Sequence, residues 1–145
     1  MWLKTISEYD GATPSPPADP SHLARAEQVL DQPLPTALRD LLLECNGVSD
    51  EYGTEVVWGI TRILEANLSF RSEPSFRSLY MPFEPLVFFG ENGGGDQFAF
   101  VRTPSRDDVF VWDHETDSRT WIAPRLEPFL RNALTHPGTD WYRPL

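Results

Sequence analysis

Three consecutive glycines beside two carboxylates are the first feature of this sequence that could do chemistry. They lie in FFGENGGGDQFAF, residues 88–100, where Glu91, Asn92 and Asp96 supply side-chain oxygens. A glycine-rich loop cradles phosphate when it leads from a strand into a helix, because the helix N-terminus meets the anion. Here the residues that follow, DQFAFV, are typical of a strand, and no GKS or GKT is present. The pattern therefore favours a hairpin turn, with buried Phe88 and Phe98 in the flanking strands and a positive φ at one of the glycines at 93 and 94.

The same oxygens raise the alternative of a calcium site. An EF-hand loop places its ligands at alternate positions ahead of a terminal glutamate, and that spacing is missing here. A structural zinc site is not expected either, because the sequence has a single cysteine, Cys45, and no cluster of cysteine and histidine. We expect no metal and no other cofactor. Asp96 is instead expected to bond backbone amides of the turn.

His114 stands between Asp113 and Glu115, and a carboxylate beside a histidine can tune a general base. On a strand, however, adjacent side chains point to opposite faces, so His114 would not share a face with either carboxylate. We therefore interpret DHETDS as a polar turn between two strands and assign no catalytic residue. An enzyme or metal-dependent domain centred on Asp96 and His114 is the less favoured hypothesis, and a pocket in which both side chains converge would support it.

Composition narrows the range of partners. The chain has 145 residues, which suits one domain. Its 22 acidic residues outnumber 12 basic ones, giving a net charge of −10, and such a chain would repel nucleic acid. It suits a basic protein surface, although acidity can also serve solubility alone. No run of about 18 apolar residues and no cleavage signature is present, so we expect a cytoplasmic protein that does not span a membrane.

The elements that must position these groups are expected to be helices first and strands later. Residues 10–20 predict an extended, proline-rich arm, residues 54–60 a short strand, and residues 72–85 a loop whose aromatic side chains pack on the sheet. Helical spacing appears in residues 20–30, 34–47, 60–70 and 126–134, with Asn46-Gly47 ending the second helix as a left-handed C-cap. Strands are expected in residues 85–90, 96–101, 108–113 and 119–123.

This order predicts an α+β fold, a single domain in which helices surround a central, mostly antiparallel sheet with a β-meander in the C-terminal half. We expect an N-terminal segment and arm over residues 1–20, the domain over residues 21–134, and an irregular tail over residues 135–145. The sequence leaves the oligomeric state open.

The ordered set of motifs resembles the SUKH superfamily, which includes fungal Smi/Knr-type regulators of cell-wall assembly and bacterial toxin-immunity proteins. The matching pieces are LPTALRDLLLECNG, VVWGITRI, FFGENGGGDQFAF, VFVWDHET and LEPFLRNAL. The resemblance implies a non-enzymatic domain without shared catalytic residues, whose bacterial members bind and neutralise a toxin, often a nuclease or deaminase. The positions that match the family pattern have a structural character: Leu34, Pro35, Asn46, Gly47, Gly90, Gly95, Asp96 and Trp112.

Acidic residues gather in or near the turns of the meander: Glu91, Asp96, Asp107, Asp108, Asp113, Glu115 and Asp117. Antiparallel strands of similar length place alternate turns at one end, so residues 91–96 and 113–117 are expected to share an edge. Such a patch could steer a basic toxin, or it could be ordinary turn polarity. We interpret the chain as a protein-binding module, most simply an immunity protein; a regulatory or scaffold adaptor without a toxin partner is the alternative.

Overall fold

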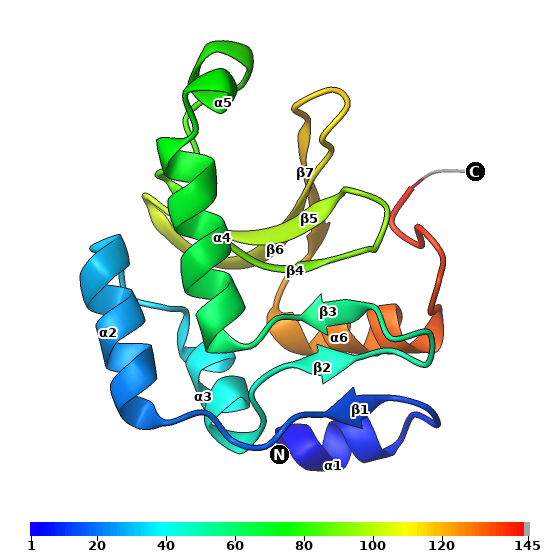
Figure 1. Ribbon diagram of the computed structural model, residues 1–145. Coiled ribbons are helices and arrows are strands. Elements are labelled where there is room, and N and C mark those ends of the chain that lie inside the picture. The colour runs from blue at the N-terminus through cyan, green and yellow to red at the C-terminus, as the bar shows by residue number, and fades with distance from the viewer. Residues whose placement is uncertain (144–145) are drawn as a thin grey trace.

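Two antiparallel sheets and the helices around them make up residues 1–143, the part of the chain that the computed structural model describes (Figure 1). The first sheet has the order β1-β2-β3 and the second the order β4-β5-β6-β7. The strands are β1 (Thr13–Pro14), β2 (Val48–Ser49), β3 (Glu55–Val57), β4 (Leu86–Glu91), β5 (Gln97–Arg102), β6 (Ser105–Trp112) and β7 (Arg119–Ala123). The helices are α1 (Trp2–Ser7), α2 (Pro20–Leu30), α3 (Thr36–Glu44), α4 (Ile60–Ser72), α5 (Pro74–Leu79) and α6 (Leu126–Thr135).

The predicted α+β single domain with a C-terminal meander is therefore confirmed, but the expected central sheet is two sheets. They come together where β3 meets β4, because the amide of Trp58 donates to the carbonyl of Phe89 at 2.7 Å. The backbones approach so closely that a Cβ on Gly90 would lie 2.0 Å from the carbonyl oxygen of Val56. Gly90 thus lets the first sheet pack beside the second.

Helices with a long apolar stripe form where the sequence places them. In α2, Asp19 accepts a hydrogen bond from the amide of Ser21 at 2.8 Å and so caps the first turn, while Leu23 and Ala26 are buried. In α6, Phe129 and its neighbours on the stripe are buried, and Pro128 falls in the first turn, where a missing amide hydrogen costs nothing. Because each of these helices buries one apolar stripe, the helical spacing of apolar residues in the sequence predicted them correctly.

Four local expectations differ from the structure. α1 and β2 were not predicted, and residues 72–85 contain α5 in addition to loop. β2 has two residues and α5 buries none of its residues, so neither has an apolar period to detect. α1 buries Trp2, Thr5 and Ile6 but spans only six residues. α3 ends without a left-handed cap, since Cys45 is extended with φ −154°. Gly47, at φ +113°, lies beyond the helix, and Asn46 Oδ1 accepts from the amide of Ile60 at 2.8 Å, in the first turn of α4.

The second sheet is covered on both faces by aromatic side chains. On one face Phe70 of α4 packs against Phe88 and Trp112, with ring centroids 4.8 and 5.6 Å apart. On the other face Phe129 of α6 packs against Phe98 at 4.7 Å. The predicted packing on the sheet is confirmed for Tyr80 and Phe83, which contact Trp112, whereas Phe76 packs on Phe83.

A buried amide fixes α4 to the second sheet. Asn67 donates to the carbonyl of Phe88 at 2.9 Å and accepts from the amide of the same residue at 2.9 Å. It also donates to the carbonyl of Ile63 within its own helix. Because each buried polar group has a partner, Asn67 sets the position of β4 against α4.

The glycine turn is a hairpin connection between β4 and β5, as the sequence predicted. Phe88 and Phe98 are buried, and Gly93 has φ +85°. The second glycine at positive φ is Gly95, at +108°. No helix follows the turn, so the phosphate-loop alternative has no structural support. Within residues 1–143, none of the helices is long and apolar enough to cross a bilayer.

Candidate functional site: a charged edge closed by the C-terminal tail

The turn between β4 and β5 and the turn between β6 and β7 lie at the same edge of the second sheet. Gln97 at the start of β5 pairs with Trp112 at the end of β6. The residues just outside this pair come into contact, with Asp96 Oδ1 3.3 Å from His114 Nδ1. The shared edge expected from the meander is therefore present, and we call the residues of these two turns, 91–96 and 113–118, the charged edge.

Asp96 is the buried centre of the charged edge, only 1% exposed. Its Oδ2 accepts a hydrogen bond from the hydroxyl of Tyr142 at 2.9 Å and forms an ion pair with Arg143. Burial and the neighbouring Asp96 raise the pKa of Tyr142, while the hydrogen bond to Asp96 raises the pKa of Arg143. Both carboxylate oxygens of Asp96 are thus engaged by side chains.

The tail that supplies these partners runs beside the β4–β5 turn, as Figure 1 shows in red. Trp141 packs against Phe129 with ring centroids 6.1 Å apart, and Tyr142 packs against Phe98 at 5.8 Å. The tail is irregular, as expected, but its last described residues contact the sheet closely. Pro144 and Leu145, also part of the expected tail, lie outside the described residues.

The side chain that hydrogen-bonds the backbone amides of the glycine turn is that of Asn92, and not that of Asp96 as expected. Asn92 Oδ1 accepts from the amides of Gly94 and Asp96 at 2.8 and 3.0 Å. A side-chain oxygen that bonds amides two and four residues ahead stabilises a turn locally. The prediction that the Asp96 carboxylate bonds loop amides was wrong, because that carboxylate points instead toward His114 and the tail.

His114 lies in a turn, as interpreted, but the argument from strand alternation does not apply to it. β6 ends at Trp112, so Asp113 and His114 are free to turn toward the same side. One ligand atom each from Asp96, Asp113 and His114 lies within 4.8 Å of the others. Gly95 makes this approach possible, since a Cβ there would lie 2.6 Å from Cε1 of His114.

Several acidic residues of the charged edge hold the fold together. Glu91 accepts from the indole Nε1 of Trp58 at 2.9 Å. Asp117 accepts from the indole Nε1 of Trp112 at 2.8 Å and from the amide of Met81 at 2.9 Å. Partial burial opposes ionisation of Asp117, but these donors outweigh it and hold its pKa below the ordinary value. These carboxylates are therefore less available to a partner than their position in the sequence suggested.

The remaining members of the acidic set differ in place and exposure. The amide of Glu115 and, against some burial, Arg143 hold the pKa of Asp113 below its usual value. The Glu115 side chain is 79% exposed. Asp107 and Asp108 lie toward the other end of β6, where Asp108 accepts from the indole Nε1 of Trp121 at 2.8 Å. The seven residues thus form no single patch. Glu115 combines a place on the charged edge with high exposure, whereas the Asp113 side chain is 19% exposed.

The contact between Asp96 and His114 raises the possibility of a general base. An aspartate against Nδ1 of a histidine can orient the imidazole as a general base, and the two side chains do converge, as the enzyme hypothesis required. A hollow of about 520 Å³ adjoins them. Among the residues that line it, none carries a hydroxyl or a thiol: Asn92, Gly93, Gly94, Asp96, His114, Glu115, Gly138, Asp140 and Arg143. The cation position between Asp96 and Asp113 is taken by Arg143, which contacts both.

Sequence reasoning missed Asn92 as the turn's organiser and Tyr142 and Arg143 as partners of Asp96. The tail carries a signal, since DWYR sets two aromatic residues and an arginine after a polar stretch. Aromatic side chains in an irregular segment often pack back on a core. Nothing local identifies Asp96, 46 residues before Tyr142, as their contact.

The described residues thus form an α+β domain in which the buried Asp96 contacts His114 and the tail, beside charged turns at one edge of the second sheet. The chain belongs to the SMI1/KNR4 family (SUKH-1), whose family model matches residues 17–132. This family includes toxin-immunity proteins and Smi1/Knr4-type regulators, is generally non-enzymatic, and consists of protein-interaction modules. A search of curated proteins gives no match to the chain. The match ends before Tyr142 and Arg143, so these two residues lie outside the matched range.

Proposed function

We propose that this protein is a non-enzymatic immunity protein that neutralises a cognate bacterial toxin, of the nuclease or deaminase type, by binding it in the cytoplasm. The observation that carries the proposal is the family match over residues 17–132. A regulatory or scaffold adaptor that uses the same surface without a toxin is the alternative within the family. In both cases the partner is a protein, and neither a cofactor nor a metal is required.

The charged edge is the surface that we propose for a basic partner. Asp96, Glu115 and Asp140 bring three carboxylates to the hollow, whereas Arg143 is the one arginine in its lining. The carboxylates thus outnumber the arginine in the lining, within a chain whose net charge is −10. A toxin that cleaves or modifies nucleic acid needs a basic surface. An acidic inhibitor can cover such a surface and exclude the substrate without chemistry of its own.

The enzyme hypothesis has one observation in its favour, the pairing of His114 with Asp96. We consider it less favoured because the lining of the hollow offers no hydroxyl or thiol that the histidine could activate as a nucleophile of the protein. Arg143 and Tyr142 also engage Asp96, which fits a structural latch between the sheet and the tail.

Neutralising two carboxylates of the charged edge, Asp113 and the exposed Glu115, is expected to slow association with the toxin domain encoded by an adjacent gene. The variant Asp113→Asn with Glu115→Gln removes two charges and keeps an oxygen that can accept from the amide of Glu115. Charges at the edge of an interface chiefly affect the diffusional encounter of the two proteins. The association rate constant at low salt is therefore expected to fall by about tenfold, and to depend less on salt concentration. Stopped-flow measurements at several salt concentrations test this.

The matched control is Asp40→Asn with Glu65→Gln, which removes two exposed charges from α3 and α4, outside the charged edge. The control and the test variant have the same net charge. A difference in their association rates therefore reports where the charges lie and not how many were removed. Equal slowing by both variants, or association insensitive to salt in every variant, would place the interface elsewhere. Asp117 and Glu91 are left intact because their hydrogen bonds to Trp112 and Trp58 stabilise the fold.

A further inference from the structure

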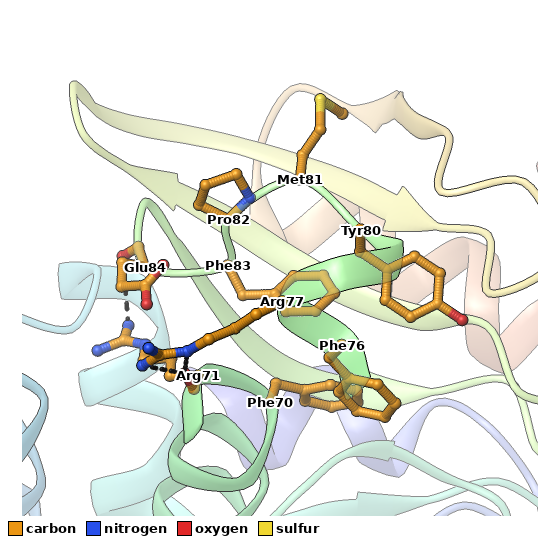
Figure 2. A pocket seen from close by; sticks show the side chains of 9 residues that line it. All are labelled: Phe70, Arg71, Phe76, Arg77, Tyr80, Met81, Pro82, Phe83 and Glu84. Atoms are coloured by element: carbon orange, nitrogen blue, oxygen red, sulfur yellow. Dashed lines mark hydrogen bonds between the residues drawn. The ribbon is translucent and has the colours of Figure 1, made fainter. Parts of the chain in front are cut away.

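A second hollow, away from the charged edge, lies between the end of α4, α5 and the segment that joins α5 to β4 (Figure 2). Its volume is about 320 Å³, within the range of sites that admit a bulky side chain or a small ligand. Four aromatic residues contribute to its lining, Phe70, Phe76, Tyr80 and Phe83. The hollow is therefore suited to an apolar group.

These aromatic walls are preformed. Phe76 stacks on Phe70 with ring centroids 5.4 Å apart, and Phe83 meets Phe70 edge-on at 5.4 Å. Tyr80 meets Phe76 edge-on at 5.5 Å, and the guanidinium of Arg119 lies 4.9 Å from the centroid of the Phe83 ring. Rings that support one another in this way lose little freedom when a ligand enters, because each has only two side-chain torsions.

The charged residues that line the hollow are Arg71, Arg77 and Glu84, so its lining carries one positive charge in excess, within a chain whose net charge is −10. Arg77 donates through Nε and Nη2 to the carbonyl of Arg71 at 3.1 and 3.0 Å, and Arg71 donates to the carbonyls of Leu30 and Leu86. Figure 2 shows Arg77 extending across the hollow toward Arg71. Within residues 1–143 the ion pairs of the chain include neither arginine. Both guanidinium groups are thus held on neutral carbonyls. Glu84 lies near Arg71 in the same lining, whereas none of the described ion pairs includes Arg77.

The rim of the hollow exposes apolar side chains. Met81, which lines it, is 55% exposed, and the neighbouring Leu79 is 69% exposed. α5 itself buries none of its residues. An exposed apolar patch rimmed by charged groups is typical of a surface that contacts another molecule.

We propose that this hollow is a docking site for a segment of a protein partner that offers a bulky apolar side chain next to a carboxylate. The apolar side chain enters between the aromatic rings, and the carboxylate contacts the guanidinium of Arg77 in charge-assisted hydrogen bonds. Charge complementarity selects this partner chemistry, because the charged edge attracts basic groups whereas the hollow presents the exposed Arg77, and Glu84 in the same lining lies near Arg71. The proposal goes beyond the immunity function and does not depend on a toxin partner.

Fluorescence anisotropy with short labelled peptides tests the proposal on the full chain. The probe is a hexapeptide in which phenylalanine and glutamate stand next to each other between glycine and serine residues. The matched peptides carry lysine in place of the glutamate, or alanine in place of the phenylalanine. We expect saturable binding of the probe and at least about tenfold weaker binding of each matched peptide.

The protein variants locate the site. Arg77→Gln is expected to weaken binding of the probe by about tenfold. Arg125→Gln removes an equally exposed arginine from the N-terminus of α6 and is expected to leave binding unchanged. The substitutions in the peptide test the same contact on the unaltered chain, so the result does not depend on how Arg77→Gln folds. Absence of saturable binding, equal binding of the glutamate and lysine peptides, or equal effects of the two arginine variants would overturn the proposal.

Discussion

Replacing Gly90 by alanine is expected to lower the free energy of unfolding by about 3 kcal/mol, the size of effect associated with forced overpacking in a core. The new Cβ would lie 2.0 Å from the carbonyl oxygen of Val56 and 2.7 Å from its carbonyl carbon. Both are backbone atoms, so no side-chain rotation can relieve the contact. The two sheets would have to separate where the amide of Trp58 bonds to Phe89.

Urea denaturation followed by tryptophan fluorescence measures this effect. Gly94→Ala is the matched control, because it lies in the adjoining turn, its nearest neighbouring atom would be 3.7 Å from the new Cβ, and its φ is not positive. We expect the control to change stability by less than about 0.5 kcal/mol. A Gly90→Ala variant as stable as the control would show that the sheets do not need this close approach.

Asp96→Ala is expected to lower the free energy of unfolding by about 2 kcal/mol. The substitution leaves the Tyr142 hydroxyl without its acceptor and removes one ion pair from Arg143. A buried donor left unsatisfied costs about 1 to 3 kcal/mol. The loss on the Arg143 side is smaller, because its side chain is 43% exposed and keeps contacts with Asp113 and Asp140. The tail is expected to become accessible to protease in the same variant.

Limited proteolysis and urea denaturation of Asp96→Ala test these two expectations together. Asp107→Ala serves as the control, since it removes an exposed carboxylate at the other end of β6 and should be nearly neutral. Asp96→Asn keeps an acceptor for Tyr142 and is expected to lie between the two. Unchanged stability and an unchanged cleavage pattern in Asp96→Ala would mean that the tail contacts contribute nothing to the folded state.

Sequence patterns predicted the parts of the fold in which one face is buried. The stripe of α6 and the apolar run of β4 were found because burial imposes a period of 3.6 residues on helices and an apolar run on buried strands. α1, β2 and α5 were missed because two- to six-residue elements bury too few side chains to create a period. Their existence depends on distant partners, as when Val48 of β2 pairs with Val57.

The candidate site was predictable only in its outline. A meander brings alternate turns to one edge, and this argument correctly joined Asp96 to the turn that holds His114. The direction of each side chain was not predictable, because it depends on where β6 ends and on contacts across more than forty residues. Arg143 illustrates the limit, since no local pattern indicates that it pairs with both Asp96 and Asp113.

The central claim is that this domain acts by stoichiometric binding and not by chemistry. Titrating the activity of the toxin domain from an adjacent gene with this protein tests the claim most directly. We predict that activity falls linearly to zero at one equivalent, and that toxin separated from the complex under denaturing conditions keeps an unchanged mass and regains full activity on refolding. Loss of activity far below one equivalent with a lasting change in toxin mass, or full activity at excess inhibitor with no complex formed, would contradict it.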